Sequence, residues 1–314
     1  MCPLSVTCLG FFVMNCVFET CYLWNIKLDG FKTSQLAVLL LKEALYTSQK
    51  GLLKMVLKTL TIGGSDTWGG GGIQTDLRTF ENLNTFGLTV LTCIAVEEGD
   101  NFAIRALSVE LVKEQLQTIE KNFQLDGVKI GLLATVEIVE VVIDFCRRHQ
   151  GDFPIILDPV LAFKETQEQL AAEYIEKMKT LFPLVDLITP NRNEAQLLAN
   201  SEPIETLEAM VDVTKKLADQ IKVKMIVTGG GLIATDLYRD GMETRAFSGP
   251  LSEKKTNHGA GCSFSSAICS HLARDFSLFE SIDKSKKYVF EAIENGVIVG
   301  DAGNVWHPIT HEEE

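Results

Sequence analysis

From Met55 onward, short apolar runs alternate with longer segments of helical periodicity. The runs that we interpret as buried strands are Val56–Ile62, Leu88–Val96, Val128–Ile130, Ile155–Leu157, Leu184–Ile188 and Met225–Val227. Most are followed by an amphipathic stretch of helical length, which is the order typical of β-α-β units. The pattern therefore predicts an α/β domain built on a mainly parallel sheet.

The C-terminal third follows a different pattern. Thr235–Arg239 and Thr244–Phe247 flank Asp240-Gly241 and predict a hairpin. Two helices, roughly Gly261–Arg274 and Leu278–Gly296, then close the domain. We place this single domain at residues 55–300 and interpret residues 301–314 as a polar tail.

Residues 1–54 look foreign to this domain. Four of the eight cysteines lie in the first 21 residues. The apolar stretch Leu9–Trp24 contains Glu19, lacks a basic start and is short for a membrane span. We expect an appended extension or a mis-started leader, with no membrane insertion.

Charge and cysteine usage narrow the function classes. The formal net charge is -13 and the sequence pI is about 4.9, so the average surface repels nucleic acid and anionic membranes. The cysteines show no Cys-x-x-Cys spacing, and a chain of 314 residues can bury its own core without disulfides. A cytoplasmic protein without a nucleic-acid partner is expected.

Six glycines occupy ten positions, 63–72, directly after the first predicted strand. Such a segment lets the backbone approach a ligand and presents amide groups at a helix start. It is not a Walker loop, because no Gly-x4-Gly-Lys-Ser/Thr occurs. A merely flexible turn is the alternative; in the functional interpretation, Asp66 and Gly72 contact the substrate.

A second glycine cluster opens a later helix at Gly259-Ala260-Gly261-Cys262. Amides in a first helical turn stabilise negative charge that develops during phosphoryl transfer. The same field is expected to lower the pKa of Cys262, which could then accept a proton from a substrate hydroxyl. A packing role for the glycines, with a small residue at the helix start, explains the sequence equally well.

Polar groups also follow three other predicted strands. Asn191 and Glu194 lie one helical turn apart and suit a hydrated Mg²⁺, although an ordinary capping box has the same spacing. Asp158 follows a strand, where its carboxylate could take part in Mg²⁺ or phosphate chemistry or cap a helix. Thr228 and Gly230 could contact a nucleotide or form a tight turn. All these clusters fall at strand ends of one sheet, where ligands bind in parallel α/β folds.

Together these motifs resemble the hydroxymethylpyrimidine kinases and the related bacterial pyridoxine kinases of the ribokinase-like superfamily. The most specific segments are Gly64–Asp66, Gly70–Leu77, Lys129–Leu133, Asp158–Val160, Thr189–Asn191 with Glu194, and His258–Cys262. The resemblance covers about residues 57–297. It implies a three-layer α/β/α sandwich, use of ATP and Mg²⁺, and a homodimer.

The resemblance also implies residue roles. Gly259 to Cys262 would form the anion hole, with Cys262 at the position where sugar-kinase relatives carry a catalytic Asp. Lys164 matches a family lysine that could steady the transferring phosphate. The remaining roles concern Mg-ATP: Asp158, Asn191 and Glu194 serve it, and Thr228 and Gly230 line the nucleotide.

Departures from the family pattern bear on the substrate. Glu97 stands where the pyrimidine enzymes carry a Gln, and Phe163 stands where some pyridoxine kinases carry a lid Cys. Asn257 replaces the Thr commonly found before His258. The sequence Gly-Ala-Gly-Cys-Ser-Phe resembles the pyridoxine kinases more than the pyrimidine kinases and favours a vitamin B6 substrate.

We therefore expect transfer of the ATP γ-phosphoryl group to the hydroxymethyl group of pyridoxine, pyridoxal or pyridoxamine. Cys262 would be the general base, and Asp66, Glu97 and the first glycine loop would hold the heterocyclic alcohol. Hydroxymethylpyrimidine and phosphomethylpyrimidine kinase activity in thiamine biosynthesis is the first alternative. A non-catalytic module that binds the vitamer is the second.

Overall fold

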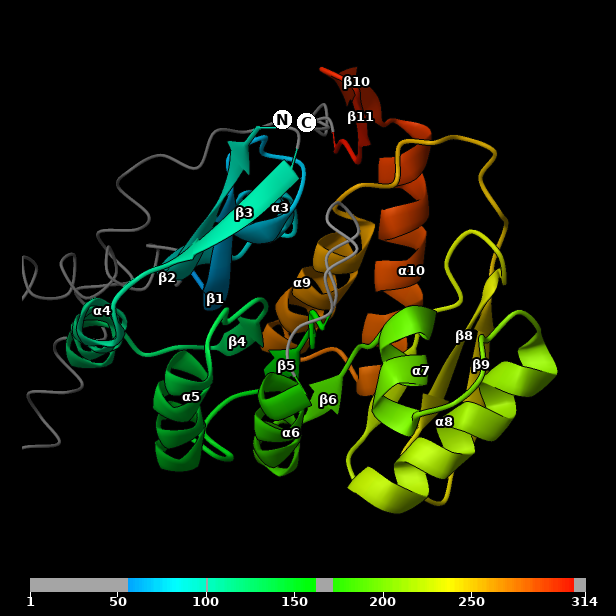
Figure 1. The fold of residues 1–314 in the computed structure, drawn as a ribbon, viewed down its shortest axis with the longest axis horizontal. Coiled ribbons are helices and arrows are strands. Elements are labelled where there is room, and N and C mark those ends of the chain that lie inside the picture. The colour runs from blue at the N-terminus through cyan, green and yellow to red at the C-terminus, as the bar shows by residue number, and fades with distance from the viewer. Residues whose placement is uncertain (1–55, 100, 162–171, 308–314) are drawn as a thin grey trace, which may run out of the picture. The chain divides into compact units, whose positions relative to one another are not determined.

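A computed structural model describes residues 56–99, 101–161 and 172–307 (Figure 1). The interpretations of residues 1–54, Phe163 and Lys164 lie outside the described residues. Nine strands of the described part form one sheet in the order β3-β2-β1-β4-β5-β6-β7-β8-β9. Their bounds are β1 (Lys58–Asp66), β2 (Phe86–Glu98), β3 (Asn101–Ala106), β4 (Gly127–Ile130), β5 (Ile155–Leu157), β6 (Leu187–Ile188), β7 (Met225–Val227), β8 (Thr235–Arg239) and β9 (Thr244–Ser248).

The six central strands, from β2 to β7 in spatial order, are parallel. Strands β3, β8 and β9 pair antiparallel at the two edges. The sheet is therefore mainly parallel, and the hairpin predicted around Asp240-Gly241 is confirmed as β8–β9.

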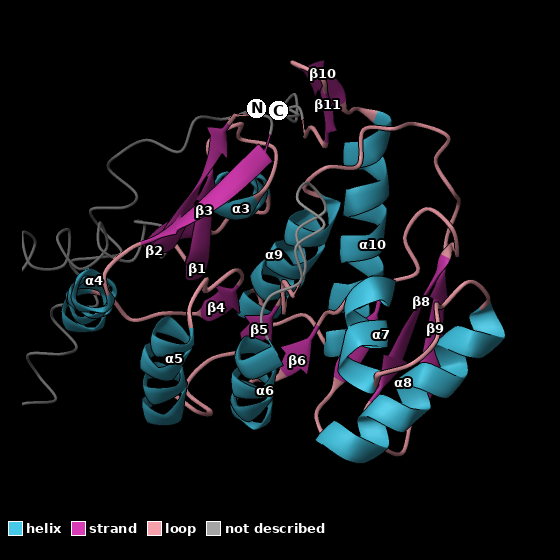
Figure 2. Ribbon diagram, viewed as in Figure 1, coloured by secondary structure: helices cyan, strands magenta, loops and turns pink. Residues whose placement is uncertain are grey.

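Helices cover both faces of the sheet (Figure 2). One layer consists of α3 (Gly72–Asn82), α9 (Ala260–Ala273) and α10 (Leu278–Glu294). The other consists of α4 (Val109–Asn122), α5 (Val136–Arg148), α6 (Ala172–Leu181), α7 (Arg192–Ala199) and α8 (Leu207–Ile221), with a 3-10 turn η1 (Phe182–Leu184). The three-layer α/β/α sandwich that the family resemblance implies is confirmed.

Alternation along the strands supplies a core on each face. Ile155 and Leu157 of β5 pack into the cluster under α4, α5, α6 and α8, whereas Ile156 between them packs against the α9 side. All three side chains are buried. Successive strand residues point to opposite faces, so a strand covered on both sides must be apolar throughout, as this run is.

Several boundaries differ from the predicted ones. The run predicted as a strand at Leu184–Ile188 forms a strand only at Leu187–Ile188, because Pro183 lies in the turn η1, where it favours a bend over strand pairing. Strand β1 continues to Asp66. The hairpin of β10 (Val297–Val299) and β11 (Ala302–Asn304) was not predicted, and β11 falls within residues interpreted as a polar tail.

Among the described residues, every helix is too short or too polar to cross a membrane.

Candidate functional site

The carboxyl ends of the parallel strands surround a cavity of about 280 Å³. Asp66 at the end of β1, Gly131 after β4, Asp158 after β5 and Asn191 after β6 all line it. Apolar walls come from Cys93 and other residues, namely Ala95, Ile104, Leu132 and Val160. An apolar cavity with a few convergent polar groups is the usual form of a small-molecule site.

A second cavity of about 560 Å³ lies next to the first, and Asn191 and Gly261 line both. The turn after β7, which contains Thr228 and Gly230, forms one of its walls. The start of α9 also contributes, through Ala260. The start of this helix therefore stands at the junction of the two cavities.

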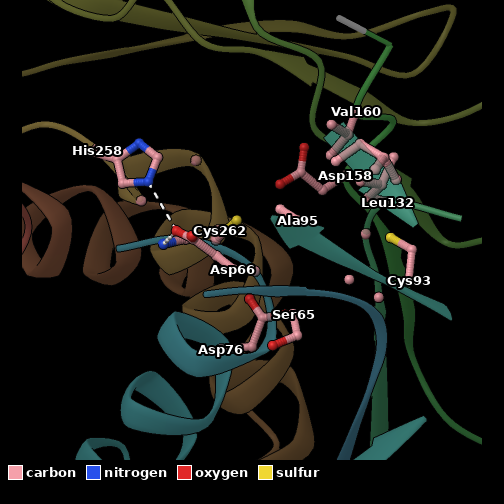
Figure 3. A pocket seen from close by; sticks show the side chains of 18 of the residues that line it. Ser65, Asp66, Asp76, Cys93, Ala95, Leu132, Asp158, Val160, His258 and Cys262 are labelled. Atoms are coloured by element: carbon pink, nitrogen blue, oxygen red, sulfur yellow. Dashed lines mark hydrogen bonds and ion pairs between the residues drawn. The ribbon is translucent and has the colours of Figure 1, made fainter. Parts of the chain in front are cut away.

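Asp66 is held rigidly in the first cavity. Its carboxylate accepts the Gly71 N–H at 2.7 Å and the Trp68 N–H at 2.9 Å, and it lies 3.1 Å from Nε2 of His258 (Figure 3). Burial alone raises the pKa of a carboxyl, but the bonds from His258 and the two amides outweigh it, and the pKa of Asp66 is lowered. The site therefore presents a fixed anion to a ligand.

Two glycines allow the loop segments to close around this carboxylate. Gly72, which opens α3, has φ of 57°, and a Cβ there would collide with the carbonyl oxygen of Gly64. Gly259, the residue before α9, has φ of 86°, and a Cβ there would collide with the carbonyl oxygen of Gly70. Only glycine satisfies both demands, so the two glycine clusters are packed against one another.

Cys262 lies in the first turn of α9 and lines the first cavity, on the same side as Asp66 in Figure 3. The expected low pKa was wrong for the ligand-free site. Burial raises the pKa of Cys262 to about 12, although the Lys129 ammonium and the Gly72 amide act in the opposite direction. The free-energy cost of burying a thiolate at this position is larger than the stabilisation that one helix N-terminus gives it.

A buried ion pair borders the same cavity. Lys129 Nζ lies 3.0 and 2.9 Å from the two carboxylate oxygens of Asp76, and the side chains are 1% and 0% exposed. Thr61 and Ser266 each donate to this carboxylate at 2.6 Å. Sequence reasoning assigned no role to the pair; the available signal was a lysine inside the buried run of β4.

Asp158 and Glu194 both line the first cavity and are 7% and 3% exposed. Glu194 accepts the Asn191 N–H at 2.9 Å while the Asn191 side chain accepts the Glu194 N–H, so the capping box is present. Capping and a role in the cavity therefore coexist. The described residues contain no cluster of three metal-ligating side chains. Two carboxylates nevertheless suit Mg²⁺ when phosphates and waters complete its coordination.

Hydrogen bonds and an ion pair from neighbouring elements hold the turn after β7 in place. Asp236 accepts the Gly229 N–H at 3.0 Å and pairs with Lys286 at 2.6 Å. Thr228 forms a parallel bridge to Asn191, with its N–H donating to the Pro190 carbonyl at 3.0 Å. The second cavity thus offers a preformed glycine-rich backbone to a ligand.

Glu97 lies outside the wall of the first cavity. Glu97 is exposed and is not among the residues that line the cavity, whose wall from β2 consists of Cys93 and Ala95. His258 and Ala302 were not predicted as site residues, yet both line the cavity. The backbone N–H of His258 donates to Gly303 at 3.0 Å, so the unpredicted hairpin sets the position of its ring.

Comparisons with known proteins agree on one family. The family model described as phosphomethylpyrimidine kinase matches residues 66–307. A hydroxymethylpyrimidine/phosphomethylpyrimidine kinase of Aquifex aeolicus is 36% identical over 246 residues, covering 77% of this chain and 96% of that protein. A pyridoxine kinase of Bacillus subtilis is 33% identical over 244 residues, covering 75% and 90%. The structure of Staphylococcus aureus pyridoxal kinase in complex with AMP-PCP and pyridoxal superimposes with a TM-score of 0.73 at 30% identity, covering 82% and 96%.

Proposed function

Because this chain belongs to the phosphomethylpyrimidine kinase family, we propose that it transfers the γ-phosphoryl group of ATP to the hydroxymethyl group of a B6 vitamer. The observation that carries this assignment is the pair of adjoining cavities that meet at the start of α9. The alcohol occupies the smaller cavity and the nucleotide occupies the larger one. Gly261 and Asn191 stand where the two ligands meet.

The residues of the smaller cavity orient the alcohol. Asp66 offers a fixed carboxylate to a polar ring substituent or a protonated ring nitrogen, and the apolar wall around Cys93 and Ala95 receives the ring. Holding both reactants in one geometry is a large part of catalysis in phosphoryl transfer. Glu97, exposed outside this wall, approaches the ring only through a movement of the end of β2.

The transfer exchanges one P–O bond for another. The hydroxymethyl oxygen attacks the γ-phosphorus in line with the departing ADP oxygen, and the hydroxyl proton passes to Sγ of Cys262 in its thiolate form. The amides of Gly259 and Gly261 at the start of α9 would stabilise the charge on the transferred group, whereas the Ala260 N–H donates to the Asn257 carbonyl at 3.2 Å. Asp158 and Glu194 would hold Mg²⁺, which neutralises phosphate charge when bound.

A competition assay tests the assignment. The chain is incubated with ATP and Mg²⁺ and with pyridoxal, pyridoxine and hydroxymethylpyrimidine at equal concentration, and the phosphorylated products are separated. We expect a B6 phosphate as the main product. The relatedness to the Aquifex aeolicus enzyme supports hydroxymethylpyrimidine as the alternative, and a pyrimidine phosphate as the main product would establish it. Absence of any product would identify a binding module instead.

Residues outside the described part enter this proposal only through the family resemblance. Lys164 is expected to steady the transferring phosphate, and the homodimer stays a prediction.

A further inference from the structure

Lys129 and Asp76 form an ion pair that is almost fully buried beside the alcohol cavity. Burying an ion pair costs desolvation free energy, and apolar residues of similar volume often serve stability as well or better. Both members of the pair line the alcohol cavity, although their side chains are almost inaccessible. This position suggests a role in the reaction.

The hydrogen bonds show that Asp76 is the member of the pair that is held in place. Asp76 accepts from Lys129 through both oxygens, from Thr61 through Oδ2 and from Ser266 through Oδ1. A carboxylate accepts about four hydrogen bonds, so its capacity is filled and it is a poor acceptor for another proton. Asp76 therefore holds the ammonium in place.

The network includes Ser266 of α9, the helix that also carries Cys262. Ser266 follows Cys262 by four residues and so lies one turn below it on the same face of the helix. On the other side, Gly131 leaves room for the ammonium, because a Cβ there would lie 2.9 Å from Lys129 Nζ. Cys262, Lys129, Asp76 and Gly131 all border the one cavity.

We propose that Lys129 is a positioning residue for the transfer: its ammonium, clamped by Asp76, stabilises negative charge on the Cys262 sulfur as the substrate proton arrives and leaves. The inference rests on the proposed role of Cys262 as the base. Three charged groups act on this sulfur: Lys129 from β4 attracts its negative charge, while Asp76 from α3 and Asp158 after β5 oppose it. Lys129 is the attractive member of this set.

The test uses thiol reactivity, which does not depend on turnover. Alkylation of Cys262 by iodoacetamide is followed at about pH 8 in EDTA, by mass spectrometry of the peptide that contains it, because only the thiolate reacts. The double variant Asp76→Asn/Lys129→Met removes both charges together. It is expected to react about tenfold more slowly, as for a rise of one pKa unit.

The single variant Asp76→Asn supplies the opposite sign. It removes a repelling carboxylate, and Asp158, which also raises the pKa of Lys129, is expected to keep the ammonium protonated, so Cys262 should react faster than in the unmodified chain. Loosened packing would move both variants in the same direction, and that result, or an unchanged rate in the double variant, would overturn the proposal. If Asp76→Asn does not fold, the sign in the double variant decides, because loosened packing would speed alkylation rather than slow it.

Two further measurements separate the causes. Ser266→Ala removes a donor to Asp76 without changing any charge, and its alkylation rate should stay within about twofold. The double variant should also lose about tenfold in kcat with little change in either KM, since the charge acts on the transition state. Opposite alkylation shifts in a chain without kinase activity would contradict the proposed function and leave the electrostatic role of Lys129 intact.

Discussion

At the scale of single residues, the proposed role of Cys262 as the base predicts how the rate depends on pH. Its pKa is raised to about 12 by burial, so the thiolate fraction of the free enzyme should increase about tenfold per pH unit throughout the neutral and mildly alkaline range. We expect log kcat/KM to rise with pH with a slope near one, without a plateau at the ordinary thiol pKa of about 8.5. Initial rates between about pH 7 and 10 test this.

The matched variant is Cys262→Ala. It should lower kcat by about 10²- to 10⁴-fold, the range for loss of a general base, while the KM of ATP stays nearly constant. Full turnover in this variant would refute the base assignment.

Asp66 is the residue on which alcohol binding should depend. Asp66→Asn removes a charge-assisted acceptor, so the KM of the alcohol should rise about tenfold or more, whereas the KM of ATP should change less than about twofold. Asp126→Asn is the control, because Asp126 also accepts a backbone N–H, from Lys58 at 2.7 Å, but lies at the amino end of β4. Equal effects of both variants on the alcohol KM would contradict the assignment.

At the scale of elements, the start of α9 depends on the close approach of two glycine segments. Gly259→Ala should lower the melting temperature and kcat together, because it adds a left-handed strain of about 1–3 kcal/mol and a collision with Gly70. Gly241→Ala is the control: Gly241 has φ of 92°, but a Cβ there would meet open space, so this variant adds backbone strain without a collision. Melting curves and initial rates of both variants are compared. A kcat loss as large in Gly241→Ala would exclude the collision as the cause.

The elements that could be predicted are those with a burial pattern. The central strands are apolar on both faces, and their runs were found with small boundary errors. Strand β10 was missed because Ile298 and Val299 are 77% and 56% exposed, which leaves no alternation to detect. The Lys129–Asp76 pair was missed because 53 residues separate its members, and only the fold brings them together.

The site could be predicted because its motifs follow the ends of parallel strands, not because of their spacing along the chain. Clusters at strand ends were expected to converge, and Asp66, Asp158, Asn191 and Cys262 do line one cavity. Glu97 was expected there from its place in the family pattern, but sequence does not show how far a strand end leans toward a cavity. The pKa of Cys262 was misjudged because burial cannot be read from a motif.

At the scale of the whole molecule, the two cavities predict how ligands stabilise the fold. A ligand at about 100 times its Kd adds about 2.7 kcal/mol to the free energy of unfolding. Because Asn191 and Gly261 are the only residues of the described part that line both cavities, an unreactive ATP analogue and a B6 vitamer should raise the melting temperature additively. Differential scanning fluorimetry with each ligand and with both measures this. Mutual exclusion of the two ligands would contradict separate sites.

The C-terminal hairpin completes the first cavity although it is among the last parts of the chain to be synthesised. The backbone of His258 is bonded on one side to Gly303 and on the other to Val305, and Ala302 completes the cavity wall. A nascent chain that has exposed every helix through α10 still lacks these partners. On the ribosome, the polypeptide thus completes the wall of the first cavity only once residue 305 has emerged, after all the strands of the main sheet have been made.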